Sequence, residues 1–154
     1  MFRNMRRKDR EISINDAREI LTKGSYGVLS TLSDNGYPYG IPVNYIFYNG
    51  HIYFHSAKEG HKLDNIRNNS KVSFCVVGSE EVLPDQFTTD YESAVVFGEA
   101  KEVSDIEKEE ILLEIIKKYS PEFIEKGKKY IGALESKTTV VKIEIKHLSG
   151  KSRK

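Results

Sequence analysis

Hydrophobic and polar residues alternate most clearly near the C-terminal end of the chain. In the segment 138–147, three aliphatic residues alternate with charged ones. A period of two residues predicts a strand with one face in a core. Five other segments have a similar character and predict further strands over 28–32, 41–48, 51–56, 72–77 and 93–103.

Turn residues separate these strands and predict how they connect. Asn35-Gly36 and Asn49-Gly50 each tolerate the positive φ of a tight hairpin turn. We therefore expect consecutive antiparallel hairpins. Pro42 cannot donate a backbone hydrogen bond, so it should lie at a bulge or an unpaired point. Gly98 predicts a bend in the strand over 93–103.

Helical periodicity occurs in three places. Ser13 has capping-box spacing to Asp16 and predicts a short amphipathic helix that ends at Gly24. A second short helix is expected over 61–68. Ser104 begins a full capping box, which predicts a longer helix that restarts after Ser120-Pro121.

These elements predict one α+β domain over residues 1–154, with antiparallel strands closed into a barrel. Residues 1–12 form an N-terminal arm that is either solvated or a dimer clasp. Residues 104–132 form a helical insertion before the last strand. Residues 78–90 have no clear pattern.

Composition excludes several classes of function. Lys and Arg number 24 against 23 Asp and Glu, so the net charge of +1 does not favour a nucleic-acid partner. A single cysteine, Cys75, excludes a disulfide framework and multi-cysteine metal sites, and we expect no metal site. No apolar run has the ~18–20 residues of a membrane span, and no signal-peptide core follows the basic N-terminus. We therefore expect no membrane partner and a cytoplasmic location.

The segment 53–62 is the most informative for chemistry. A strand ends in small polar residues, a glycine turn follows, and a helix begins beside a cation. Free N–H groups at the helix start, the Ser56 hydroxyl and the Lys62 charge are typical of a pocket for one phosphate group. An ordinary strand–turn–helix with a solvated lysine has the same pattern, so both interpretations stay open.

The segment 36–45 places Gly and Pro at close spacing, which keeps backbone groups out of regular pairing. Asn44 offers an amide donor and acceptor to the edge of a planar heterocycle. An irregular edge strand with half-buried tyrosines is the alternative.

Together these motifs resemble the pyridoxamine 5′-phosphate oxidase-like superfamily, and more closely the nitroimidazole-resistance (Nim-type) branch of its flavin-binding split barrels. The resemblance covers nearly the whole chain and rests on the segments 26–31, 36–39, 42–45 and 53–57, with Gly60 and Lys62. It implies a six-stranded antiparallel split β-barrel of Greek-key type with peripheral helices. It also implies a homodimer with FMN, or FAD, at the subunit interface.

The resemblance further implies roles for individual residues. Val43, Asn44 and Tyr45 would flank the flavin ring. Ser56, Ala57 and Lys62 would hold its phosphate, and His55 would lie beside them. Val95 would approach the flavin from the other subunit. The chain lacks the Trp-containing C-terminal signature of true pyridoxamine phosphate oxidases, because it has no Trp. That substrate is therefore not expected.

The first functional hypothesis is an FMN-dependent oxidoreductase. Electrons would come from a reduced nicotinamide or a reduced partner and pass to a small organic acceptor such as a nitroimidazole. His55 is either a catalytic proton donor and acceptor or a residue that orients a loop. One alternative is a haem-binding or haem-degrading protein with His55 or His147 on the iron. Others are a flavin-binding module without turnover and a deazaflavin-using relative.

Overall fold

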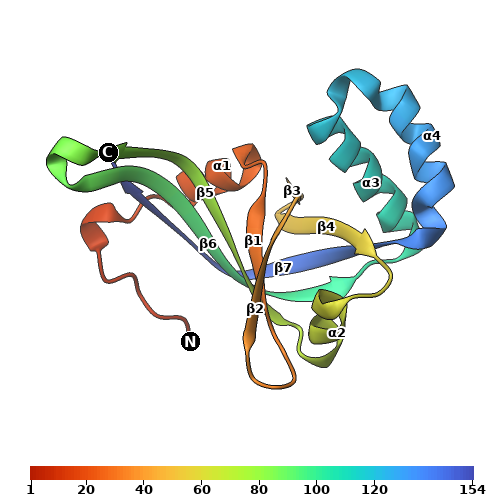
Figure 1. Ribbon diagram of the computed structural model, residues 1–154, viewed down its shortest axis with the longest axis horizontal. Helices are drawn as coiled ribbons and strands as arrows, with labels where there is room; N and C mark the ends of the chain where they lie inside the picture. The colour runs from red at the N-terminus through yellow and green to blue at the C-terminus, as the bar shows by residue number, and fades with distance from the viewer.

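A single antiparallel sheet of seven strands organises the computed structural model, which describes residues 1–154. The strands are β1 (Gly27–Leu32), β2 (Pro38–Val43), β3 (Ile46–Tyr48), β4 (His51–Ala57), β5 (Lys71–Leu83), β6 (Thr88–Glu102) and β7 (Thr138–Arg153). Their order across the sheet is β2-β1-β5-β6-β7-β4-β3 (Figure 1). The end strands β2 and β3 do not pair with each other, so the sheet curls without closing. The prediction of an antiparallel α+β fold is confirmed. The predicted closure into a barrel is wrong, because β2 and β3 remain the unpaired edges of the sheet.

Four helices accompany the sheet: α1 (Ile14–Lys23), α2 (His61–Asn68), α3 (Asp105–Tyr119) and α4 (Ile124–Leu134). The predicted bounds of α2 are confirmed. The α3–α4 pair stands at one end of the molecule, beyond β4, while the β5–β6 hairpin and the end of β7 extend from the opposite end (Figure 1). No helix is both long and apolar enough to cross a membrane.

The prediction of one strand over 41–48, and with it the count of six strands, is wrong. Val43 ends β2 opposite Gly27 of β1, whereas Ile46 begins β3 opposite Tyr53 of β4. The chain leaves the ladder between them because the Tyr45 ring turns fully into the core. Pro42 lies in β2, an edge strand of the sheet, where a missing donor is tolerated.

Strands β5, β6 and β7 are longer than predicted. The unassigned segment 78–90 continues β5 and β6 into a hairpin that turns at a 3₁₀ helix (Pro84–Gln86). β7 continues past His147 as the partner of β6. Most side chains of 78–87 are exposed, so no hydrophobic alternation marks that part of the hairpin.

The predicted bend at Gly98 is confirmed. The β6–β7 register shifts between Phe97 and Gly98. A Cβ atom at Gly98 would lie 2.4 Å from the carbonyl oxygen of Glu144, so the two backbones approach too closely for any larger residue.

Two hydrophobic clusters hold the fold together. The larger fills the inner face of the sheet, where α1 covers it; Leu21, Phe54, Phe74 and Val96 are among its members. The smaller lies between β3–β4 and the α3–α4 pair. The sheet is therefore packed on its inner face throughout and on its other face only at the β4 end.

Helix caps agree with the sequence at one end of the fold and differ at the other. The Ser13 hydroxyl accepts a hydrogen bond from the Asp16 N–H at 3.0 Å, as predicted. The prediction of a capping box at Ser104 is wrong, because the Ser104 side chain makes no capping hydrogen bond. Its expected partner, Glu107, instead accepts a hydrogen bond from the Tyr53 hydroxyl at 2.8 Å, which ties α3 to β4.

Candidate functional site

The turn from β4 into α2 presents the start of a helix to solvent. β4 ends at Ala57, and α2 begins after Gly60, whose φ of 149° falls in the region that favours glycine. The Asp64 N–H closes the first helical turn on the Gly60 carbonyl at 3.1 Å. The N–H groups before it have no acceptor within the helix and point toward the turn.

Lys62 and Ser56 flank this turn. Lys62 is half-buried and forms none of the ion pairs of the chain. Ser56 donates its hydroxyl proton to the Ala57 carbonyl at 2.7 Å. A cation without a carboxylate partner beside free N–H groups can bind a phosphate oxygen.

His55 belongs to the same group. It lies on the face of β4 that also carries Tyr53, opposite Val140 of β7. Desolvation by its surroundings lowers the pKa of His55, and the positive charge of Lys62 lowers it further. At neutral pH its imidazole is therefore neutral and able to accept a proton.

A polar network, missed by the sequence analysis, anchors α2 to the end of β1. The Asn65 amide donates to the hydroxyls of Thr31 at 2.9 Å and Ser33 at 3.2 Å. Ser33 is also 3.0 Å from Nε2 of His61, and the Tyr39 ring stacks on that imidazole at 4.0 Å. The start of α2 is thus fixed from two sides. The only local signal for this contact is the alternation of Thr31, near the end of β1, with Ser33, which follows the strand.

The connection between β2 and β3 carries three of the predicted site residues. The Asn44 amide donates to the Ser25 carbonyl at 3.0 Å, and this side chain remains exposed. The Tyr45 side chain is fully buried and donates its hydroxyl to the Leu21 carbonyl. Surface contact with a ligand is therefore open to Val43 and Asn44 but not to the Tyr45 ring.

The end of α3 holds this connection in place. The Tyr45 N–H donates to the Tyr119 hydroxyl at 3.0 Å, and Lys118 Nζ donates to the Tyr45 carbonyl at 2.9 Å. Burial lowers the pKa of Lys118 to about 8. The sequence did not predict this clamp, because α3 is far from Tyr45 along the chain.

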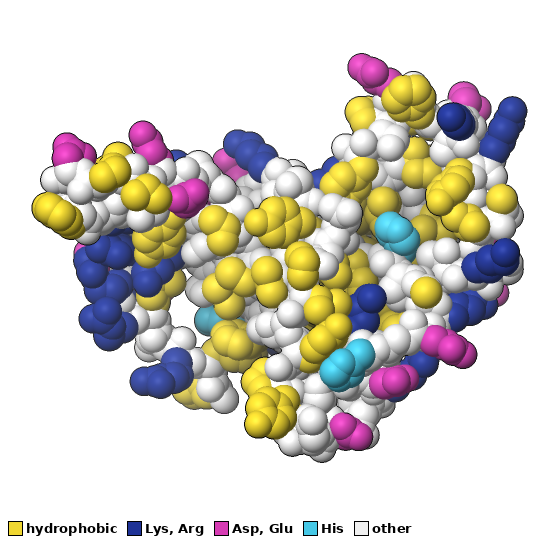
Figure 2. Space-filling view, viewed as in Figure 1, with side chains coloured by type: hydrophobic (Ala, Val, Ile, Leu, Met, Phe, Trp, Pro, Cys, Tyr) yellow, Lys and Arg dark blue, Asp and Glu magenta, His cyan; other side chains and the backbone are white.

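Val95 lies apart from these groups. It sits on the outer face of β6, between Cys75 of β5 and Ser149 of β7. That face is apolar: Val28, Val77 and Phe97 also emerge from it and are exposed. Figure 2 shows hydrophobic side chains gathered over the central strands, with charged side chains toward the edges. One chain alone does not bring Val95 to the β4–α2 turn, since β7 separates β6 from β4.

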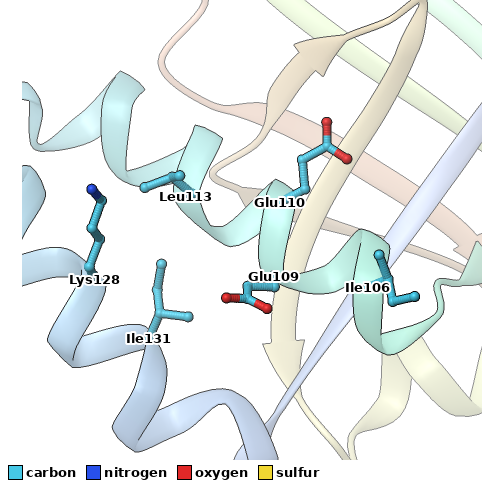
Figure 3. Close-up of a pocket in the computed structure, with 6 residues that line it drawn as sticks. All are labelled: Ile106, Glu109, Glu110, Leu113, Lys128 and Ile131. Carbon is cyan, nitrogen blue, oxygen red and sulfur yellow. The ribbon is translucent and has the colours of Figure 1, made fainter.

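A cavity of about 450 Å³ opens between α3 and α4. Its walls combine aliphatic and charged side chains: Ile106, Glu109, Glu110, Leu113, Lys128 and Ile131 (Figure 3). It contains none of the predicted site residues and lies on the helical insertion, away from the β4–α2 turn.

Comparison with known proteins places this geometry in context. A family model described as pyridoxamine 5′-phosphate oxidase matches residues 13–152. No curated protein matches the chain.

Several solved structures share the fold. One is described as a candidate 5-nitroimidazole antibiotic resistance protein of Bacteroides thetaiotaomicron, with TM-score 0.74, 20% identity, and coverage of 92% of this chain and 86% of that one. An FAD-binding protein of Mesorhizobium loti has TM-score 0.72, 24% identity and coverage of 94% and 98%. An FAD and haem binding protein of Mycobacterium smegmatis has TM-score 0.77, 16% identity and coverage of 92% and 72%.

Proposed function

The chain belongs to the pyridoxamine 5′-phosphate oxidase family, and from that premise we propose that it binds a flavin nucleotide, FMN in the first place, and acts as an oxidoreductase. The observation that carries the proposal is the unpaired Lys62 at the open start of α2, beside Ser56. FMN and FAD share the inner phosphate, so this site accepts either.

The residues at the turn fit a flavin phosphate. A dianionic phosphate needs directed donors and a positive charge. The first N–H groups of α2 and Lys62 supply both, and the Ser56 hydroxyl would add a donor by turning from the Ala57 carbonyl to the phosphate. Ala57 is small enough to let the group approach. The Asn65 network holds α2 in the position that this binding needs.

The flavin ring would extend from the phosphate toward Asn44, whose amide offers hydrogen bonds to the ring edge. A bound flavin supplies two-electron transfer. His55, neutral at neutral pH, would accept or return the proton that accompanies those electrons. We propose a reduced nicotinamide as donor and a small organic acceptor, with nitroimidazoles as the first class to test because one structural neighbour carries that description.

The site requires a second copy of the chain. The outer face that carries Val95 is apolar and open, and a two-fold dimer through this face would cover it. Val95 of one copy would then approach the flavin site of the other, which a single chain cannot achieve.

Two measurements test this function. The purified protein, or the protein reconstituted with FMN, should show the two visible bands of an oxidised flavin and elute at the mass of a dimer. With a reduced nicotinamide it should then reduce a nitroimidazole. Flavin binding without turnover would identify a binding module, and failure to bind either flavin would contradict the proposal.

Haem binding is the second candidate, because one neighbour is described as an FAD and haem binding protein. Its structural basis in this chain is His147, whose ring stacks with Phe2 at 4.9 Å on the outer face of the sheet. A Soret band after addition of haem, lost in His147→Ala, would favour this candidate over the flavin.

A further inference from the structure

A cavity of about 410 Å³ opens beside the middle of β7, between that strand, α1 and the β3–β4 hairpin. Its size is within the range of cavities that bind small molecules. It borders Gly50, just before β4, whereas the proposed flavin phosphate site follows Ala57 at the other end of β4. The two sites are therefore separate, and a ligand of this cavity does not depend on flavin binding.

The cavity lies where one edge of β7 is uncovered. β4 pairs with β7 only as far as Glu144, and the N-terminal arm reaches the same strand at Gly150 and Lys151. Between these points β7 pairs with β6 alone. A strand edge without a neighbour leaves backbone groups open to another partner, so this gap is a natural place for a ligand.

A β-bulge in β7 turns two apolar side chains toward the gap. The β6–β7 register shift at Gly98 leaves Lys146 without a partner on β6. In a regular strand, side chains three positions apart point to opposite faces. The bulge instead brings Ile145 and Leu148 to the same face, where both pack against the larger hydrophobic cluster and line the cavity. Bulges that re-aim side chains in this way are common beside functional sites.

The other apolar walls come from Phe47 of β3 and Ile14 of α1. Phe47 also packs against the larger cluster, so it is fixed in place like the two residues of β7. Ile14 is 45% exposed, and a bound apolar group would cover it. The walls are thus formed before a ligand arrives, which lowers the cost of binding.

Arg18 gives the cavity an uncompensated positive charge. It lies one helical turn after the first residue of α1, on the same face of that helix. Its guanidinium donates to Asn15 Oδ1 at 3.3 Å and forms no ion pair. Lys146, also in the lining, is already paired with Glu99 at 3.6 Å and Glu144 at 3.7 Å. None of the lining residues is acidic, so the cavity favours an anion.

We propose that this cavity binds a small monocarboxylate with an apolar body, of the class of medium-chain fatty acids and aromatic acids. The planar guanidinium of Arg18 can donate to both oxygens of a carboxylate. The apolar body would lie along Phe47, Ile145 and Leu148. A phosphate dianion matches the cavity less well, because it needs a second free cation and Lys146 already has carboxylate partners.

Methyl NMR of protein labelled at the isoleucine methyl groups tests the proposal, with octanoate as the first probe. The Ile145 signal is identified by its loss in Ile145→Val. Octanoate should shift this signal saturably and leave the signal of Ile131, in the α3–α4 cavity, unchanged. The octanoate affinity read at Ile145 should fall about tenfold or more in Arg18→Met, because a charge-assisted pair is lost. Arg18 is exposed, so this variant should fold normally.

Two further variants make the result specific. Lys23→Met removes a paired cation from the same helix. Arg6→Met removes an exposed arginine that also lacks an ion pair but lies outside the cavity. Octanoate affinity should be unchanged in both variants. An Ile145 signal that octanoate does not move, or equal affinity in wild type and Arg18→Met, would overturn the proposal.

Two probes that each carry half of the ligand separate its charge from its apolar body. Acetate has the carboxylate without the chain, and 1-octanol has the chain without the charge. Each should bind at Ile145 about tenfold more weakly than octanoate, or less. Binding of either as tight as that of octanoate would contradict a site that recognises both parts.

A last titration distinguishes the two kinds of apolar body. If 1-naphthoate binds more tightly than octanoate at Ile145, the ligand is an aromatic acid. If octanoate binds as tightly or more tightly, the ligand is a fatty acid.

Discussion

Asn44 and Tyr119 share one acceptor, the carbonyl oxygen of Ser25, which the Asn44 amide reaches at 3.0 Å and the Tyr119 hydroxyl at 2.6 Å. The end of α3 therefore fixes the connection between β2 and β3 that carries Asn44. The helical insertion thus positions a residue of the proposed flavin site, although it contributes no ligand-binding side chain itself.

Replacement of Tyr119 by Phe should loosen this connection. The variant leaves the Tyr45 N–H without its acceptor, so the free energy of unfolding should fall by about 1–3 kcal/mol and flavin affinity should fall with it. Chemical denaturation and a flavin titration measure the two effects. Tyr130→Phe is the matched control because Tyr130 is exposed. Equal flavin affinity in both variants would contradict a positioning role.

Lys118 should titrate far below an ordinary lysine, with a pKa of about 8 because burial penalises its charged form. In the unfolded chain its pKa is ~10.4, so the unfolded state binds more protons between these values and stability rises with pH across that window. Relative to Lys118→Met, the wild type should gain about 1–2 kcal/mol from pH ~8 to pH ~10, after allowance for solvent screening. A pH-independent difference between the two proteins would refute this assignment.

His55 and Lys62 should be coupled electrostatically. Lys62→Met removes one of the two causes that lower the pKa of His55 and leaves desolvation, so that pKa should rise part of the way to its ordinary value. NMR titration of the imidazole C2–H signal measures the change, and His51 provides an internal reference because Lys62 is not among the charges that act on it. An unshifted His55 would show that the two side chains do not lie together.

Gly60 should be required for the shape of the β4–α2 turn. A Cβ at this position meets no atom within 4 Å, so Gly60→Ala acts only through its φ of 149°. The strain should cost about 1–3 kcal/mol and reduce flavin affinity. Gly36→Ala, also at positive φ in open space, should destabilise the protein without changing flavin affinity. Isothermal titration of both variants with FMN would disprove the role of the turn if they bound equally.

Local signals in the sequence were enough to predict some elements of the fold. The start of α1 follows from the Ser13 cap, and the bend at Gly98 from a single residue without a side chain. The phosphate-binding pattern at 53–62 is likewise contiguous in the chain, which is why Lys62 and Ser56 could be proposed before the structure was known.

Other features depend on contacts between distant parts of the chain. The break between β2 and β3 exists because the Tyr45 side chain is buried and the Tyr45 N–H donates a hydrogen bond to the Tyr119 hydroxyl. No local sequence pattern predicts this long-range contact. Glu107 does not form the predicted capping contact, because its carboxylate accepts a hydrogen bond from the Tyr53 hydroxyl. The hairpin of 78–90 was missed because its exposed end lacks the alternation that marks a half-buried strand.

The affinity of Lys62→Met for FMN tests the central claim most directly. The dissociation constants of wild type, Lys62→Met and Lys71→Met are measured by quenching of flavin fluorescence; Lys71 is an exposed lysine that begins β5. A charge-assisted contact is worth about 1.5–3 kcal/mol, so we expect about 10- to 150-fold weaker binding in Lys62→Met and unchanged binding in Lys71→Met. Equal affinity in all three proteins, or no binding of FMN by the wild type, would contradict the flavin site at the start of α2.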